Sequence, residues 1–302
     1  MCTLVAKESG SGWILASNSD NPYTVQSRVL SVAGPGYTYL ATSITMPPDK
    51  NGAPVPWSDM LTRGVNSAGL AFTYAYVEPL APHRWPRQQW TADLLAEEAD
   101  CASAVDLMRR RREQIIPGNY LLADRRGEAV LVEVAPGGLA LRTPTDGLLS
   151  CTNVWEELLD PTAKGWAADT ASAERAAASH QLAEGSAPAR LAQDVLTDHS
   201  GAADDDRRVK GSSICNHGRL EGTISSEVLE PEPGRLWWSF GWPCGGSHGH
   251  EAHRRQSWGR FLAFDIAGVT DSADLTTPHG ELTAAGATLV TGVRVVRRPE
   301  AT

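Results

Sequence analysis

The chain begins Met1-Cys2-Thr3, with a cysteine directly behind the initiator methionine. Methionine aminopeptidases act when the second residue is small, so processing would leave Cys2 as the first residue. Such a residue carries a thiol, with a pKa of about 8.5, and an α-amine, with a pKa of about 7.7 to 8.0. The neutral amine can take the thiol proton, so no separate histidine base is needed. Cys2 is therefore a candidate nucleophile, although a cysteine at this position is by itself more often incidental.

The segments that follow predict that Cys2 is held in a sheet. Residues 2–7 and 12–17 are short apolar runs, and Glu8 to Gly12 between them are typical of a tight turn. Cys2 would therefore start an edge or central strand of a hairpin. The polar run from Asn18 to Pro22 ends the second strand, so the hairpin would place Asp20 beside Cys2. Its carboxylate could there orient the terminal ammonium or the thiol. A turn-capping aspartate is an equally good interpretation of Asp20.

The rest of the chain alternates between strand-like and helix-like stretches. Their order, strands, helices, strands, helices, strands, predicts sheets with helices on their outer faces. Length and an apolar content of 41% fit one α+β domain over residues 1–302, with a polar loop or lid around 201–210 and a less certain C-terminal segment over 246–302. We expect strands within 28–46, 63–76, 118–133, 148–153, 213–215, 223–229 and 235–240, and helices within 89–113 and 167–200.

Charge and composition argue against several partners. A net charge of −9 does not suit nucleic acid or an anionic membrane, because phosphate binding needs clustered Lys and Arg. The dense basic run from Arg109 to Arg112 lies in a helical stretch and fits a solvated helix face. No apolar run approaches the roughly 18 residues of a membrane span, and no secretory signal precedes Cys2, so we expect a cytoplasmic protein. The five cysteines are odd in number and widely spaced, which argues against a disulfide framework.

Further residues could complete a site around Cys2. A thiol that attacks an amide needs a donor for the developing oxyanion, and Asn153, at a predicted strand end, could supply one. Tyr74 and Tyr76 could give another donor or line a pocket, although strand aromatics more often pack in a core. Trp155 and Trp242 could accept a planar or apolar acyl group. The expected partner is a small-molecule amide, and no cofactor is expected. The sequence does not decide whether the protein forms a homo-oligomer.

The joint order of several motifs resembles a known family. The pattern over residues 2–245 is similar to that of the N-terminal nucleophile (Ntn) hydrolases of the choloylglycine hydrolase, penicillin V acylase and isopenicillin-N acyltransferase-like group. Single motifs are weak, but their order is fairly specific. The matching stretches are Met1-Cys2-Thr3, Ser17 to Asp20, Gly64 to Leu70, Gly118 to Asp124, Cys151-Thr152-Asn153, Gly222 to Ser226 and Leu236 to Cys244.

The resemblance carries expectations about fold and chemistry. It implies a four-layer αββα fold, in which two antiparallel sheets are flanked by helices. It also implies hydrolysis or transfer of an acyl group through a thioester on Cys2. Asp20 matches the family's aspartate near the nucleophile. Asn153 matches the asparagine that contributes to the oxyanion hole, together with a backbone N–H.

The chain departs from the choloylglycine hydrolases at three places. They carry an arginine where this chain has Ser17, and an asparagine on the strand where it has Tyr74 or Tyr76. A later arginine of that family is not evident beside Ser213. These departures argue against bile salts and penicillin V as substrates. Because Cys2 directly follows Met1, removal of the methionine should suffice for maturation.

Other interpretations stay open. The acyl group could pass to an amine, which would make the chain an acyltransferase, or the fold could be a non-catalytic binding protein. Cys215 and His217 could form a thiol–imidazole pair on one face of a strand. The stretch from Cys244 to His253 holds a thiol, three imidazoles and a carboxylate. Its spacing is not a standard zinc pattern, so an exposed polar loop is favoured there over a bound metal.

Overall fold

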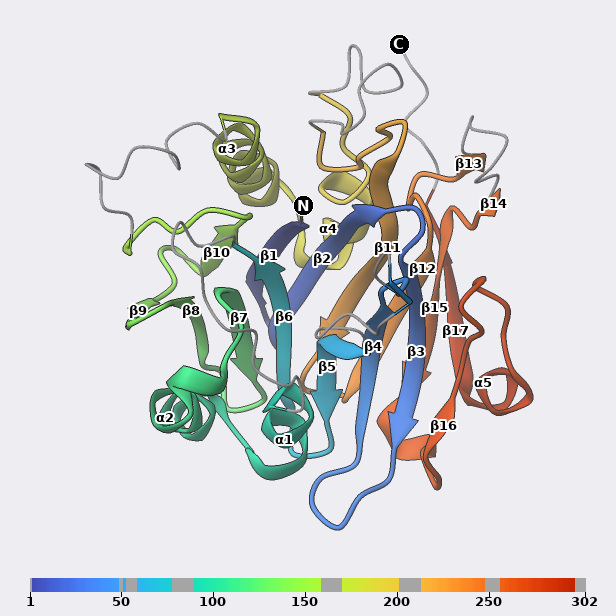
Figure 1. Cartoon of the computed structure of the whole chain (residues 1–302), viewed down its shortest axis with the longest axis horizontal. Helices are drawn as coiled ribbons and strands as arrows, with labels where there is room; N and C mark the ends of the chain where they lie inside the picture. The colour runs from blue at the N-terminus through green and yellow to red at the C-terminus, as the bar shows by residue number, and fades with distance from the viewer. Residues whose placement is uncertain are drawn as a thin grey trace.

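Two antiparallel sheets face each other across the molecule (Figure 1). The computed structural model describes residues 2–48, 51–52, 59–77, 90–158, 170–200, 213–247 and 256–296. The first sheet has seven strands in the order β10-β1-β2-β11-β12-β15-β17. These strands are Cys2–Ser9 (β1), Gly12–Pro22 (β2), Leu148–Cys151 (β10), Glu221–Glu230 (β11), Arg235–Phe240 (β12), Arg260–Asp265 (β15) and Val290–Val295 (β17).

The second sheet has eight strands in the order β16-β3-β4-β5-β6-β7-β8-β9. From β3 to β9 each strand pairs with the next one along the chain, so most of this sheet is built from successive hairpins. Its strands are Gln26–Val32 (β3), Tyr39–Thr45 (β4), Met60–Asn66 (β5), Leu70–Tyr76 (β6), Gly118–Asp124 (β7), Ala129–Ala135 (β8), Gly138–Arg142 (β9) and Ala273–Asp274 (β16), and the short strands Gly246–Ser247 (β13) and Gln256–Ser257 (β14) form a separate pair.

Helices cover the outer face of each sheet, which gives four layers. Apolar residues of the second sheet pack against the helices α1 and α2, and those of the first sheet pack against α3 and α4. A third apolar cluster fills the space between the sheets. The short helix α5 lies beside β16, at the right of Figure 1. The helices are Trp90–Glu97 (α1), Cys101–Arg110 (α2), Thr170–Gly185 (α3), Leu191–Asp194 (α4) and Ala284–Leu289 (α5).

Strand β1 is an inner strand, between β10 and β2. Cys2, its first residue, pairs with Ser19 of β2. Leu4 belongs to the core between the sheets, whereas Val5 belongs to the core under α3 and α4. Because both faces of β1 are covered, its sequence is a continuous apolar run rather than an alternating one. The predicted hairpin is thus present, and it fixes Cys2 in the sheet.

Some predicted elements differ from the structure. The stretch 89–113 forms two helices because Asp100 starts the second: its carboxylate accepts from the backbone N–H of Ser103 at 2.9 Å, and the two residues form a capping box. The predicted strand 213–215 is wrong, since Cys215 donates its N–H to Asp198 in irregular structure. The C-terminal segment supplies β15 and β17 to one sheet and β16 to the other. The predicted lid over 201–210 lies outside the described residues.

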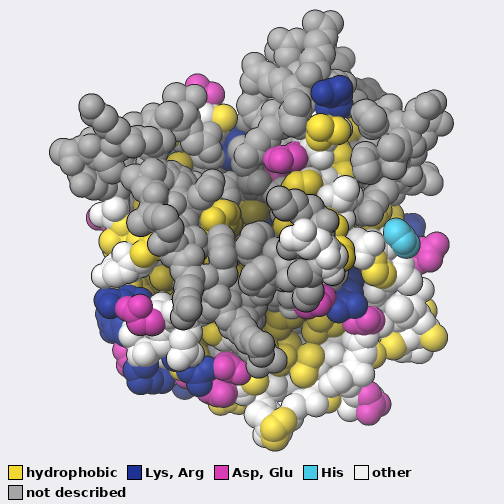
Figure 2. Space-filling view, in the orientation of Figure 1, with side chains coloured by type: hydrophobic (Ala, Val, Ile, Leu, Met, Phe, Trp, Pro, Cys, Tyr) yellow, Lys and Arg dark blue, Asp and Glu magenta, His cyan; other side chains and the backbone are white. Residues whose placement is uncertain are grey.

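The basic run Arg109 to Arg112, at the end of α2, is balanced by acids, as expected for a solvated face. Figure 2 shows Lys and Arg side chains interspersed with Asp and Glu at the lower left, where Figure 1 places α1 and α2. Arg111 pairs with Asp93 and Glu97 of α1, and Arg109 pairs with Asp106 at 3.1 Å. Of the helices in the described ranges, none has the length and apolarity to cross a membrane.

Candidate active site

Cys2 and Asn153 meet directly at the end of β1. The Cys2 nitrogen donates to Oδ1 of Asn153 at 2.5 Å, and Nδ2 of Asn153 donates to the backbone carbonyl of Tyr76 at 2.7 Å. An amide NH₂ has two donor positions, so one hydrogen of Asn153 remains for another acceptor. Asn153 follows β10 of the first sheet and Tyr76 ends β6 of the second. The contact therefore joins the two sheets at the candidate nucleophile.

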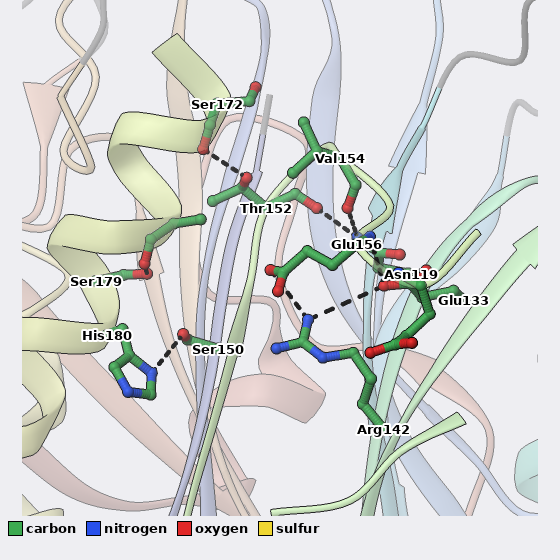
Figure 3. A network of polar contacts seen from close by, with 12 residues as sticks. Asn119, Glu133, Arg142, Ser150, Thr152, Val154, Glu156, Ser172, Ser179 and His180 are labelled. Carbon is green, nitrogen blue, oxygen red and sulfur yellow. Dashed lines mark hydrogen bonds and ion pairs between the residues drawn. The ribbon is translucent and has the colours of Figure 1, made fainter. Parts of the chain in front are cut away.

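A buried asparagine holds the backbone on both sides of Asn153. Nδ2 of Asn119, on β7, donates to the carbonyl of Thr152 at 2.8 Å and to that of Val154 at 2.6 Å (Figure 3). The hydroxyl of Thr152 donates in turn to the carbonyl of Ser172 on α3, at 2.8 Å. With two carbonyls and one hydroxyl beside Asn153 bonded in this way, the loop has little freedom, and Asn153 is presented to Cys2 in one orientation.

Glu133, on β8, holds the next part of the same loop, residues 156–158. Its carboxylate accepts from the backbone N–H groups of residues 156, 157 and 158, at 2.8, 2.9 and 3.0 Å. Burial raises the pKa of Glu133, while these three donors and Arg142 oppose the rise. Figure 3 shows Asn119, Glu133 and Arg142 gathered beside the loop. Sequence reasoning missed this support, because a buried polar strand residue gives no local pattern.

We expect Asn119→Ala to lower both stability and turnover. The carbonyls of Thr152 and Val154 would lose their common donor inside the protein, which costs about 1–3 kcal/mol of unfolding free energy. Because the loop then gains freedom, kcat should fall as well. Urea unfolding and steady-state kinetics measure the two effects, with the exposed Gln114→Ala as the control. Full turnover in a destabilised Asn119→Ala protein would show that this asparagine does not position Asn153.

Asp20 lies one residue beyond the partner of Cys2 in β2 and is almost fully buried. Its Oδ1 accepts from the Thr223 hydroxyl at 2.7 Å. Burial raises the pKa of Asp20, whereas the N-terminal ammonium, Arg175, Thr223 and Asn216 act to lower it. Because Ser19, its chain neighbour, pairs with Cys2, the backbone of Asp20 lies close to the start of β1.

Arg175, on α3, is a functional candidate that sequence reasoning missed. It is 2% exposed, donates to Ser172 Oγ at 2.9 Å and approaches Oδ1 of Asn153 at 3.5 Å. It also stabilises the charged form of Asp20. One guanidinium therefore links the two polar residues predicted to serve Cys2. In the sequence it stands in an Ala-rich helix, where an arginine usually marks a solvated face.

A second buried arginine stands beside Ser17, the position at which the choloylglycine hydrolases carry one. Arg63 of β5 donates through Nε to the Ser17 hydroxyl at 3.2 Å, and it pairs with Glu227 of β11 at the same distance. Both charged side chains are at most 1% exposed. A residue of another strand thus places a positive charge beside Ser17.

The four residues predicted to contact the substrate lie in different surroundings. Tyr76 reaches the site through its backbone carbonyl, and Trp155, 8% exposed, lies two residues after Asn153. Tyr74 packs on Tyr120 at 4.7 Å in the core that α1 and α2 cover, and its hydroxyl donates to the carbonyl of Pro117. Trp242 stacks on the His217 ring at 3.6 Å. Tyr74 and Trp242 therefore both pack against another ring, and their contact with a substrate stays a prediction.

The alternative nucleophile Cys215 does approach His217, with 3.4 Å between Sγ and Nε2. It is fully buried, and burial, helped by Cys244, raises the pKa of its thiol well above the usual range. Cys2 keeps 8% of its surface exposed. Cys215 therefore suits attack on a substrate less well than Cys2 does. The predicted stretch from Cys244 to His253 is described only to residue 247.

Comparisons with solved structures agree with this fold. Penicillin V acylase from Agrobacterium tumefaciens superimposes with a TM-score of 0.58 at 14% identity, covering 98% of this chain and 99% of that one. A mutant of the conjugated bile acid hydrolase from Clostridium perfringens gives 0.53 at 13%, covering 94% and 99%. The Caenorhabditis elegans ortholog of N-acylethanolamine-hydrolyzing acid amidase gives 0.51 at 14%, covering 76% and 93%. No curated protein sequence matches the chain.

The two-sheet sandwich, with a cysteine at the start of an inner strand, defines the αββα fold of the Ntn hydrolases. The chain belongs to the family described as acyl-coenzyme A:6-aminopenicillanic acid acyl-transferase, whose model matches residues 5–243. The predicted fold and the predicted membership of this Ntn group are thereby confirmed.

Proposed function

We propose that the protein is an N-terminal cysteine amidohydrolase that cleaves a linear amide between an acyl group and an amine. The observation that carries the proposal is the contact of the Cys2 nitrogen with Oδ1 of Asn153, whose Nδ2 is anchored on Tyr76. This arrangement orients the group that would act as the base. The relatives support an acyl–nitrogen bond as the target, since their titles name an acylase, a conjugated bile acid hydrolase and an acid amidase.

In the first half of the reaction the acyl group moves to sulfur. Removal of the methionine frees the Cys2 α-amine, which takes the thiol proton as Sγ attacks the carbonyl carbon. The free hydrogen of Asn153 Nδ2 and a backbone N–H stabilise the oxyanion. The C–N bond then breaks, the ammonium of Cys2 gives its proton to the leaving amine, and a thioester remains on Cys2.

In the second half water replaces the amine. The α-amine takes a proton from the attacking water, the C–S bond breaks, and the thiolate recovers that proton as the carboxylic acid leaves. Asp20 adjoins Ser19, the strand partner of Cys2, and Arg175 approaches the Asn153 oxygen that accepts from the Cys2 nitrogen. In the proposed reaction the Asp20 carboxylate holds the ammonium in both halves, and the Arg175 guanidinium offsets negative charge. An amine that attacks the thioester in place of water would give transfer instead of hydrolysis.

The test begins with the intact mass of the purified protein. We expect a protein lacking one methionine that gains a single adduct with a small thiol-reactive electrophile, while Cys2→Ala gains none. A panel of acyl amides with varied acyl chains should then release free acid, with an added amine acceptor as the test for transfer. Retained Met1, or labelling that ignores Cys2, would contradict the proposal and favour a binding role.

Asp20→Asn is expected to lower kcat by about 10²-fold, because a neutral amide holds the ammonium less firmly than a carboxylate. Burial raises the pKa of Asp20, so the wild-type rate should fall on the acid side at a pH above the ordinary aspartate value. As the pH drops through that raised pKa, the carboxylate takes a proton and loses its charge. In Asp20→Asn this fall in rate at acidic pH should disappear. The exposed Asp106→Asn is the matched control. If Asp20→Asn keeps the fall in rate, a group other than Asp20 causes it.

A further inference from the structure

Two cysteines and two histidines meet at one point outside the candidate active site. One ligand atom from each of His199, Cys215, His217 and Cys244 lies within 4.8 Å of the others. The two sulfurs are 3.6 Å apart, and Nε2 of His217 lies 3.4 Å from Cys215 Sγ and 3.3 Å from Cys244 Sγ. The residues come from three separate parts of the chain: the segment after α4, the loop before β11, and the segment after β12.

Backbone and ring contacts hold these residues in place. Cys215 donates its N–H to the carbonyl of Asp198 at 2.9 Å, which ties the loop to the residue before His199. The His217 ring is stacked on Trp242 and meets His199 edge to face at 4.6 Å. A turn bond from Gly245 N–H to the Trp242 carbonyl, 3.0 Å, places Cys244 on the same side. The cluster is therefore built by the fold rather than by chance contacts of exposed side chains.

Three of the four ligand atoms have the spacing of a tetrahedral metal site. Zinc lies about 2.3 Å from sulfur and about 2.0–2.1 Å from nitrogen, so the edges of the tetrahedron are about 3.8 Å between sulfurs and about 3.5 Å between sulfur and nitrogen. The edges among Cys215, His217 and Cys244 are 3.6, 3.4 and 3.3 Å, and the ligand atom of His199 lies within 4.8 Å of the other three. We propose that His199, Cys215, His217 and Cys244 bind one Zn²⁺ ion. Cysteine binds zinc as the thiolate, so two thiolates would balance the charge of the ion.

Two other uses of the same residues fit the geometry less well. A disulfide between Cys215 and Cys244 would need the sulfurs at about 2.05 Å and would leave both histidines without a purpose. A catalytic thiol–imidazole pair would need an accessible sulfur, whereas Cys215 is fully buried. Four protein ligands fill the coordination shell of zinc, which is typical of a structural rather than a catalytic site.

The proposed ion would fix the loop that carries the partners of Asp20. Asn216 stands between two of the ligands, and its N–H donates to Thr223 Oγ1 at 3.0 Å. The same hydroxyl donates to Asp20. Thr223 N–H returns a bond to the Asn216 carbonyl at 2.9 Å. Loss of the metal should therefore lower stability and disturb Asp20 without removing any group of the proposed reaction.

The experiment measures metal in the untagged full chain, purified under reducing conditions from zinc-supplemented cells. We expect one zinc per chain in the wild type by mass spectrometry of the metal, and almost none in Cys215→Ser or Cys244→Ser. Cys101→Ser, which removes another buried cysteine far along the chain on α2, should keep the metal. Replacement of zinc by Co²⁺ should give the intense visible bands and thiolate charge transfer of tetrahedral sulfur–nitrogen ligation.

The wild-type protein gives a second test that does not depend on the folding of a variant. Removal of its metal by a chelator should lower Tm, and addition of Zn²⁺ should restore Tm. Metal-free wild type that takes up neither Zn²⁺ nor Co²⁺, or equal metal in the Cys215→Ser and Cys244→Ser variants, would overturn the proposal. Three titratable thiols instead of five in denatured wild type, with no metal, would assign the cluster to a disulfide and overturn it too. None of these results depends on the reaction at Cys2, since no substrate is used.

Discussion

Cys2→Ala is expected to lower kcat by about 10³-fold or more while leaving the fold intact. The sulfur is the proposed attacking atom, and no neighbouring side chain can take over the thioester. Alanine retains the strand pairing with Ser19, and the lost volume is small. Turnover of the best amide, circular dichroism and urea unfolding measure the effects on activity and fold. Cys101→Ala is the control for loss of a buried thiol.

A second variant separates the thiol from the terminal amine. An alanine inserted between Met1 and Cys2 should still lose its methionine, but Cys2 would then carry a peptide nitrogen instead of an amine. Because a peptide nitrogen cannot take the thiol proton, we expect a loss of activity close to that of Cys2→Ala. Near-normal turnover in the insertion variant would falsify the role of the α-amine as the base while keeping Cys2 as the nucleophile.

Arg63→Met is expected to lower the free energy of unfolding by about 3–5 kcal/mol, because it leaves the charge of Glu227 buried without its partner. The two side chains are 1% and 0% exposed, and 3.2 Å separates Nε of Arg63 from Oε2 of Glu227. Urea unfolding measures the effect. Arg109→Met, which breaks an exposed pair with Asp106, should change stability by less than about 1 kcal/mol.

The double variant Arg63→Met with Glu227→Leu should recover much of that loss, since no unpaired charge remains. Burial raises the pKa of Glu227, and Arg63 is the main group opposing the rise. In Arg63→Met the folded-state pKa should therefore rise further. Stability of this variant would then fall as pH increases above the unfolded glutamate value of about 4.3, and its deficit should narrow as pH is lowered toward that value. A deficit independent of pH would mean that lost packing, not charge, is the cause.

Local sequence signals predicted much of the frame. The turn at Glu8 to Gly12 and the two apolar runs gave the first hairpin, and with it the pairing that brings Asp20 near Cys2. Asn153 was predicted from a strand end and a motif, and it contacts the Cys2 nitrogen across 151 positions of sequence. Its role in the reaction, like that of Asp20, stays a prediction.

The features that could not be predicted from the sequence depend on tertiary contacts alone. Arg175 stands in an Ala-rich helix, and Asn119 stands in an apolar strand; neither position shows which way the side chain points. His199 and Cys244 are far apart in sequence from Cys215, so no short metal-binding motif exists to be found. The strands β15 and β17 were not predicted; they lie in the C-terminal segment and extend the first sheet beyond β12.

The built-in position of Cys2 also constrains the order of events during biosynthesis. An aminopeptidase needs a loose chain end, whereas Cys2 in the finished sheet is flanked by β10 and β2 and is 92% covered, with 8% exposed. Asn153, the contact of its nitrogen, is synthesised 151 residues later. At about 5–20 residues per second this leaves a window of about 8–30 s. We therefore expect the methionine to be removed while the chain is still being synthesised, before Asn153 can contact the Cys2 nitrogen.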